Sequence, residues 1–203
     1  MSYGLEEKGK EVERMRIVVG MTGASCSLYG VAVLQALTHL NVETHLVVSE
    51  KGMQVIEHEC ELSKEDLRGM TSFVYENGDM MSPIASGSFK TDGMVIIPCS
   101  MNTLGKIAGG ITDNLITRVA DVCLKERRKL ILVPREMPLS TIHLENMLKI
   151  NKCGGQIIPA SPGFYTLPET IYDLTTIMVG RVLDSFQIDH GLGKRWGEFD
   201  RKK

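Results

Sequence analysis

The sequence lacks the marks of a secreted, membrane-spanning or zinc-binding protein. Its five cysteines (Cys26, Cys60, Cys99, Cys123 and Cys153) are odd in number and include no Cys-x-x-Cys pair, which argues against a disulfide framework and a zinc site. No apolar run approaches the roughly 18 residues of a membrane span, and the first fifteen residues are charged rather than apolar, unlike a signal peptide. We therefore expect a cytoplasmic protein with reduced thiols and no membrane partner.

An excess of charge of one sign is also missing. The 203 residues carry 23 Lys and Arg against 25 Asp and Glu, and the two signs are interspersed. No broad basic field is available for a phosphate backbone, so nucleic acid is not an expected partner. The 43% of apolar residues are enough for one domain with a substantial core. We assign a charged extension to residues 1–14, the domain to residues 15–190 and a C-terminal tail to residues 191–203.

Short apolar runs alternate with helical patterns along this domain. Strands buried on both faces are predicted at residues 16–23, 43–49, 93–100, 129–135 and 154–160. Helical spacing covers residues 25–40, 50–60, 103–128, 139–152 and 168–186. This alternation predicts an α/β fold with a doubly wound, Rossmann-like parallel sheet.

Ligands of such a sheet bind where strands end and helices begin, and the first of these turns is "MTGAS". The small residues Gly23 and Ala24 allow a ligand to approach the backbone, and we expect Ser25 to cap the next helix. The turn lacks G-x-G-x-x-G, and Ser49 stands where a ribose-binding acid would end the second strand. A mononucleotide therefore fits better than a dinucleotide, although an ordinary helix cap without a ligand is the alternative.

The later strand exits add polar groups. In "PCSMNTL", Ser100 and Thr103 supply hydroxyls and Asn102 an amide, which predicts a cradle for a phosphate and a ring, and a further helix is expected to cap at Asp113. "LVPRE" ends a strand on Arg135 and Glu136, for which we favour a ligand role over a simple ion pair.

Two loops and two single residues complete this survey. "SPGFYTLP" presents Tyr165, and "ASGSF" at residues 85–89 suits a substrate entrance. We expect His143 to cap or pack a helix and Cys99 to be a small buried residue rather than a nucleophile.

The chain resembles the flavin prenyltransferases of the UbiX type from about residue 15 to residue 198. The resemblance is carried, in the family's order, by "MTGAS", Ser49, "ASGS", "PCSMNTL", "ADVCLKERRKLILVPRE", "HLENML", "PGFY", "RVLD" and "RWGE". It implies transfer of a dimethylallyl group from dimethylallyl phosphate to reduced FMN, which makes the prenylated FMN used by UbiD-type decarboxylases. It also implies a homo-oligomer, usually a dodecamer, and a flavoprotein fold of that oligomeric type.

The resemblance further implies which residues form the site. FMN contacts would be Gly23, Ala24, Ser25, Ser49, Ser100, Met101, Asn102, Thr103 and Arg135. The dimethylallyl phosphate would be held by Lys125, Arg135, Glu136, Tyr165 and Arg181, with Glu59 and Arg118 nearby and often supplied across a subunit boundary, and with Ser88 and Trp196 as further candidates. One residue departs from the family pattern: Cys26 follows the turn serine where the family usually has glycine.

These residue types suit the implied reaction. Release of phosphate develops negative charge, for which Lys125, Arg135, Arg181 and the Tyr165 hydroxyl are suitable donors. No metal is expected, since the chain contains no Asp-Asp pair of the kind that holds magnesium in enzymes that release pyrophosphate from isoprenoids.

The same chemistry assigns roles to the other candidates. An aromatic lining such as Trp196 would suit the electron-poor allylic fragment. Glu136, with Glu59 second, is our candidate for proton handling, Ser25 would orient the flavin edge, and structural ion pairs of Arg135 or Lys125 are the alternative.

Other functions fit the residues less well. FMN-dependent decarboxylases of cysteine-derived carboxylates share the expected fold, but their pattern reads PASANT where this chain has "PCSMNT", and they place a histidine before the third strand where this chain has "ASGSF". A non-catalytic FMN carrier would have no use for Glu136, Lys125 and Tyr165. Direct decarboxylation of an aromatic acid would require turnover without a partner.

Overall fold

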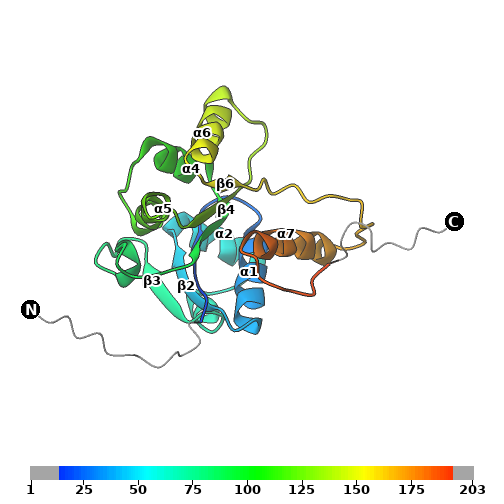
Figure 1. Ribbon diagram of the computed structural model, residues 1–203. Coiled ribbons are helices and arrows are strands. Elements are labelled where there is room, and N and C mark those ends of the chain that lie inside the picture. Colours follow the sequence, from blue (N-terminus) through cyan, green and yellow to red (C-terminus); the bar gives the residue numbers. More distant parts are fainter. Residues whose placement is uncertain (1–13, 194–203) are drawn as a thin grey trace, which may run out of the picture.

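Residues 14–193 are described by the computed structural model, and they form a six-stranded parallel sheet with helices on both faces (Figure 1). The strands are β1 (Arg16–Met21), β2 (Glu43–Val48), β3 (Phe73–Glu76), β4 (Gly93–Cys99), β5 (Lys129–Pro134) and β6 (Gln156–Ile157). Their order is β3-β2-β1-β4-β5-β6, and every pair is parallel. The predicted doubly wound sheet is confirmed, and its order reverses between β1 and β4, where this fold opens a ligand crevice.

Seven α-helices and one short 3₁₀ helix occur in the described residues. They are α1 (Ser27–His39), α2 (Glu50–Cys60), α3 (Lys64–Arg68), η1 (Pro83–Ala85), α4 (Met101–Gly109), α5 (Leu115–Lys125), α6 (Thr141–Lys152) and α7 (Ile171–Ser185). No helix in residues 14–193 has the length and apolar character needed to cross a membrane.

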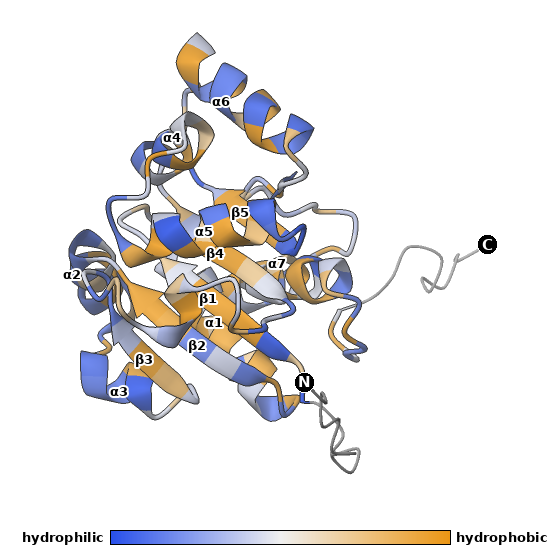
Figure 2. Cartoon of the chain, turned by 60° about the vertical axis from the view of Figure 1, so that its left-hand side comes forward, coloured by the Kyte–Doolittle hydropathy of each residue, from blue (hydrophilic) through white to orange (hydrophobic). Residues whose placement is uncertain are grey.

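The core has two layers because alternate strand residues point to opposite faces of the sheet. Ile17 and Val19 pack with α1 and α7 on one face, whereas Val18 packs with α4 and α5 on the other, and all three are fully buried. Figure 2 shows this as hydrophobic colour through the central strands. Each such aliphatic side chain stabilises the fold by about 1.5–3 kcal/mol relative to exposure, so the sheet is a rigid base for the loops at its ends.

The structure corrects several predicted elements. The helix predicted at residues 103–128 is two helices, because Gly110 adopts a left-handed conformation (φ 71°) that ends α4. The second helix is capped by Asn114 and not by Asp113: the Asn114 side chain accepts from the Thr117 N–H, and the Thr117 hydroxyl accepts from the Asn114 N–H. The last predicted strand shortens to Gln156–Ile157.

Two further elements, β3 and α3, do not correspond to any predicted strand or helix. The His143 prediction is confirmed, since His143 forms a reciprocal cap with Ser140 at the start of α6.

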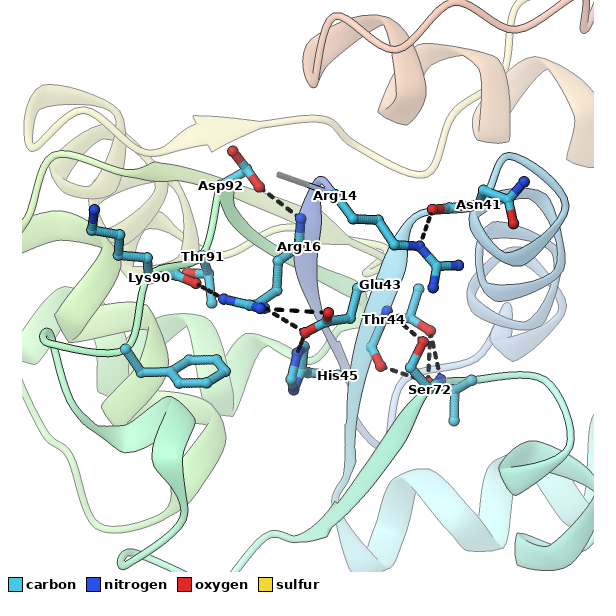
Figure 3. A network of polar contacts seen from close by, with 12 residues as sticks. Arg14, Arg16, Asn41, Glu43, Thr44, His45, Ser72, Lys90, Thr91 and Asp92 are labelled. Atoms are coloured by element: carbon cyan, nitrogen blue, oxygen red, sulfur yellow. Dashed lines mark hydrogen bonds and ion pairs between the residues drawn. The ribbon is translucent and has the colours of Figure 1, made fainter. Parts of the chain in front are cut away.

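A polar network closes the amino-terminal edge of the sheet (Figure 3). His45 is 1% exposed, and its Nε2 lies 2.8 Å from Glu43 Oε1 while its Nδ1 lies 2.9 Å from the Tyr75 hydroxyl. Glu43 also receives the Arg16 guanidinium. Burial lowers the pKa of His45, against the opposing effect of Glu43. Tyr75 belongs to the edge strand β3, so the network also attaches that strand.

Candidate functional site

A hollow of about 350 Å³ lies at the carboxyl ends of the central strands. It is lined by Thr22, Gly23, Ser49, Glu50, Lys51, Asn77, Ser100, Asn102, Thr103, Lys106, Asn114 and Ile116. Five of the residues predicted to contact FMN therefore meet in one place: Gly23, Ser49, Ser100, Asn102 and Thr103.

Thr22 joins the two strand ends at the point where the sheet order reverses. Its hydroxyl donates to the Pro98 carbonyl (2.9 Å) and accepts from the Ser100 N–H (2.7 Å). Thr22 is 3% exposed, so this double hydrogen bond is shielded from water and fixes the ends of β1 and β4 side by side. The turn after β1 and the start of α4 are consequently held in register.

Two helix N-termini open on this hollow. The Ser49 hydroxyl accepts from the Gly52 N–H (3.0 Å) at the start of α2, and the Ser100 hydroxyl accepts from the Thr103 N–H (3.3 Å) at the start of α4. The other first-turn N–H groups have no partner within their helices and carry partial positive charge. Hydroxyls, amides, Lys51 and Lys106 around such N–H groups form a donor set that fits an anionic mononucleotide such as FMN.

Two other predicted FMN contacts, Ala24 and Met101, are each only 9% exposed. The Met101 side chain belongs to the core, so the group that Met101 can offer a ligand is its backbone N–H at the first position of α4.

The predicted cap at Ser25 is wrong. Helix α1 begins at Ser27 after Cys26, which has a left-handed conformation (φ 78°) and offers no side-chain cap. Glu59, at the end of α2, supplies the missing acceptors: its carboxylate receives the Cys26 N–H (3.0 Å), the Ser27 N–H (2.8 Å) and the hydroxyls of Ser25 and Ser27 (2.5 Å each). Glu59 thus reaches the turn of its own chain.

The electrostatics of Glu59 follow from these four donors. Partial burial raises the pKa of its carboxyl, but the hydrogen bonds from Ser25, Ser27 and Cys26 outweigh it and lower the pKa below the ordinary value. The group is therefore a stable carboxylate that holds Ser25 in place. The family resemblance leads us to expect glycine at the position of Cys26, and glycine adopts this left-handed conformation without steric cost.

Packing of the chain by itself requires a glycine at position 23. A Cβ placed on Gly23 would lie 2.6 Å from the Lys51 Cβ, a separation that side chains do not tolerate. The absence of a side chain lets the first turn of α2 sit directly against the turn after β1, which brings Ser49 and Gly23 to the same hollow.

Arg135 and Glu136 follow β5 at the same edge of the sheet. They do not form the structural ion pair that was the alternative: in residues 14–193 Arg135 has no carboxylate partner, and Glu136 accepts only from the Met137 N–H (3.1 Å). Cys99 at the end of β4 is fully buried, and burial raises its thiol pKa, which leaves it unsuited to nucleophilic attack.

Tyr165 and Arg181 share a second hollow of about 360 Å³, which is also lined by Asp184 and His190. Tyr165 is 49% exposed. The Arg181 guanidinium lies 3.8 Å from Asp184, itself in contact with His190 (3.2 Å). The structure thus joins two of the predicted phosphate ligands.

Lys125 lies away from both hollows. It ends α5, whose first turn lies near the first hollow, and eleven helical residues span about 15 Å. Lys125 is paired with Glu126. Arg118, midway along α5, donates to the Ala85 carbonyl (3.0 Å) and to Asp121 (2.9 Å), and Ser88 contacts Ser86 (2.8 Å). Trp196 lies outside the described residues.

Sequence reasoning missed seven residues of the first hollow: Thr22, Glu50, Lys51, Asn77, Lys106, Asn114 and Ile116. Asn77 directly follows the unpredicted strand β3, and its side chain accepts from the Ile116 N–H (3.2 Å). Lys106 is held by Asp113 (2.6 Å). The three-residue separation of Asn114 and Thr117, typical of a reciprocal helix cap, was the available signal for Asn114.

Comparison with known proteins identifies relatives of this chain. Residues 5–182 match the family model described as "Flavoprotein". A probable UbiX-like flavin prenyltransferase of Escherichia coli O111:H- is 52% identical over 183 residues, covering 90% of this chain and 93% of the relative. The flavin prenyltransferase UbiX of Methanocaldococcus jannaschii is 46% identical over 90% of this chain and 99% of its own length.

Solved structures of similar proteins share the fold of this chain. AnUbiX (PadA1), crystallised with FMN and dimethylallyl pyrophosphate, superposes with a TM-score of 0.90 at 48% identity, covering 92% of this chain and all of that one. A dodecameric FMN-dependent UbiX-like decarboxylase from Escherichia coli O157:H7 superposes with a TM-score of 0.88 at 51% identity, covering 90% and 99% of the two chains. The peptidyl-cysteine decarboxylase EpiD, at 18% identity and a TM-score of 0.61, shares the fold alone.

Proposed function

The chain belongs to the UbiX flavin prenyltransferases of the flavoprotein family, and we propose that its substrates bind at two hollows of one subunit and at a surface of a second subunit. The enzyme transfers a dimethylallyl group to reduced FMN. The observation that supports this most strongly is the hollow at the reversal of strand order, where the N-termini of α2 and α4 converge with hydroxyl and amide donors.

FMN would be held in this first hollow. Ser49, Ser100 and Thr103 offer hydroxyls there, and Asn102 offers an amide. Gly23, Ala24 and Met101 contribute backbone, and Ser25, fixed by Glu59, orients the flavin edge. Arg135 approaches from the end of β5. When bound, reduced FMN supplies an electron-rich ring that accepts the prenyl group.

The dimethylallyl phosphate would lie between the first hollow and the second. Arg181 and the Tyr165 hydroxyl face the second hollow, and Arg135 stands without a carboxylate partner in the described chain. As the carbon–oxygen bond of the donor breaks, these groups and Lys125 donate to the departing phosphate and stabilise its growing charge. Glu136, whose carboxylate is engaged only by the neighbouring Met137 N–H, accepts the proton released on ring closure.

Lys125 enters this site from a second copy of the chain. It lies about 15 Å along α5 from the first hollow, too far to meet the phosphate within its own subunit. An assembly is also indicated by exposed apolar side chains on α6, in the loops before α6 and α7, and at the start of α7: Met137 (84%), Ile142 (68%), Leu167 (83%), Ile171 (70%) and Tyr172 (74%). Helix α6 stands away from the sheet (Figures 1 and 2). Such a surface marks an interface, and we propose the dodecamer.

Two further parts of the proposal concern the cellular setting. The prenylated FMN would pass to a UbiD-type decarboxylase. We place the reaction in the cytoplasm, because Cys99 and Cys123 are buried free thiols, as is usual where thiols stay reduced.

The test is anaerobic incubation of the protein with reduced FMN and dimethylallyl phosphate, followed by the mass and absorbance spectrum of the extracted flavin. A flavin heavier than FMN by one dimethylallyl group is expected. Incubation with oxidised FMN, and incubation without the donor, are the controls. An unchanged flavin mass in folded, FMN-loaded protein would refute the proposal, and parallel assays with dimethylallyl pyrophosphate define the preferred donor.

A further inference from the structure

Arginine side chains hold the loop at residues 85–92, hereafter the 85–92 loop, by its main chain. This loop joins η1 to β4. Arg128 donates to the carbonyls of Gly87 (2.5 Å) and Phe89 (2.8 Å), with Thr91 Oγ1 at 3.3 Å. Arg118 donates to the Ala85 carbonyl. A single guanidinium thus fixes two alternate peptides of the loop, which its planar fork of donors makes possible.

The amino-terminal edge network anchors the other end of the 85–92 loop (Figure 3). Arg16 donates from its guanidinium to the Lys90 carbonyl (2.8 Å) and from its backbone N–H to Asp92 (2.6 Å). The same guanidinium lies 4.7 Å from the centre of the Phe89 ring, which His45 meets edge-on at 5.4 Å. The loop is therefore a fixed part of the structure between two arginines.

The backbone of the 85–92 loop packs directly against the ion pair of Lys125 and Glu126. A Cβ placed on Gly87 would lie 2.4 Å from Glu126 Oε1 and 2.9 Å from Lys125 Nζ. No side chain fits at Gly87 while the ion pair keeps its place. The position of Gly87, set by its hydrogen bond to Arg128, consequently limits the space open to the ends of the Lys125 and Glu126 side chains on this side.

We propose that Arg128 is a positioning residue for the phosphate-binding Lys125: it holds Gly87 against the Lys125–Glu126 pair and so presents the ammonium at a fixed point on the subunit surface. Arg128 acts through the 85–92 loop and does not touch the substrate. This inference rests on the proposed role of Lys125. Lysine in place of Arg128 would keep the charge but lose the fork that reaches both carbonyls.

The test is a double-mutant cycle on FMN-loaded protein, with the dissociation constant for dimethylallyl phosphate measured by calorimetry and single-turnover prenylation measured alongside. Arg128→Lys is expected to weaken donor binding about tenfold in the parent and less than twofold in a Lys125→Ala background, because it acts through Lys125. Arg127→Lys, a neighbouring exposed arginine, is the matched control and should change neither value. FMN affinity should stay within twofold throughout.

A second variant keeps the test decisive if Arg128→Lys does not fold. Gly87→Ala displaces the ion pair directly and should show the same non-additivity with Lys125→Ala. The proposal would be overturned if Arg128→Lys or Gly87→Ala weakened donor binding equally in the parent and in the Lys125→Ala background, or did not weaken it at all. Unchanged donor binding in Lys125→Ala would also overturn it. Failure of the parent to prenylate FMN refutes the proposed function separately, since the binding cycle does not depend on turnover.

Discussion

Replacing Glu59 by glutamine tests the most connected side chain of the candidate site. Its carboxylate accepts from two backbone N–H groups and two hydroxyls at the start of α1. A glutamine keeps one acceptor oxygen and turns an N–H₂ group toward donors. Loss of a helix cap costs about 0.5–2 kcal/mol, and a hydrogen bond to a charged group contributes about 1.5–3 kcal/mol. Because Glu59 is exposed on one side, we expect Glu59→Gln to lower the free energy of unfolding by about 1–2 kcal/mol.

The assay is urea unfolding at a fixed subunit concentration, since assembly adds to apparent stability. The pKa of Glu59 is lowered in the folded chain, so its contribution is present above the unfolded value of about 4.5 and is lost as pH falls through the folded value. Glu59→Gln should therefore lose stability at pH 7 and converge with the parent in acid. Glu57→Gln, on the same helix, is the control. A Glu59→Gln loss no larger than the Glu57→Gln loss at pH 7 would show that this carboxylate does not cap α1.

Three other predictions follow from single sites. Arg181→Ala should spare FMN binding but slow single-turnover prenylation about a hundredfold or more, since a charged donor to the departing phosphate contributes roughly 2–4 kcal/mol; Tyr165→Phe should cost less, and parent rates for Arg181→Ala would reject its assignment. The folded pKa of His45 is lowered, so the contribution of His45 to stability is present above about pH 6.5 and lost as pH falls through the folded value. Between pH 7.5 and 5.5 the melting temperature should therefore fall less in His45→Gln than in the parent. Cys26→Gly should raise stability by up to about 1 kcal/mol in urea, because a left-handed non-glycine residue carries a strain of about 1–2 kcal/mol that outweighs the added freedom of the unfolded chain.

The buried strands could be predicted because both of their faces are covered. β1, β2, β4 and β5 appear in the sequence as continuous apolar runs, and each was placed within a few residues. β3 has four residues at the sheet edge, and its Phe73 is 50% exposed, so it leaves no such run. Its attachment depends on His45 and Tyr75, which are 30 residues apart in the chain and carry no local signal.

Site residues that follow a strand could likewise be predicted from topology. Ser49 and Ser100 follow β2 and β4, the two parallel strands on either side of β1, so both lie at the carboxyl edge of the sheet and their meeting follows from the strand order. The pairing of Glu59 with Ser25, 34 residues away, does not, because α1 and α2 must pack before the carboxylate can reach the turn. Family resemblance indicated both residues, but only the structure shows that Glu59 replaces the cap expected from Ser25.

The position of Lys125 follows from the same topology. In a doubly wound sheet a helix leaves the carboxyl end of one strand and returns to the amino end of the next. Lys125 ends such a helix four residues before β5 begins, so it must lie at the amino-terminal edge, opposite the first hollow. The proposed contact between Lys125 and the phosphate therefore requires the chain to present Lys125 to another copy. Assembly would then be part of the catalytic apparatus, and a dissociated subunit should bind FMN in its first hollow yet lack one of the donors to the departing phosphate.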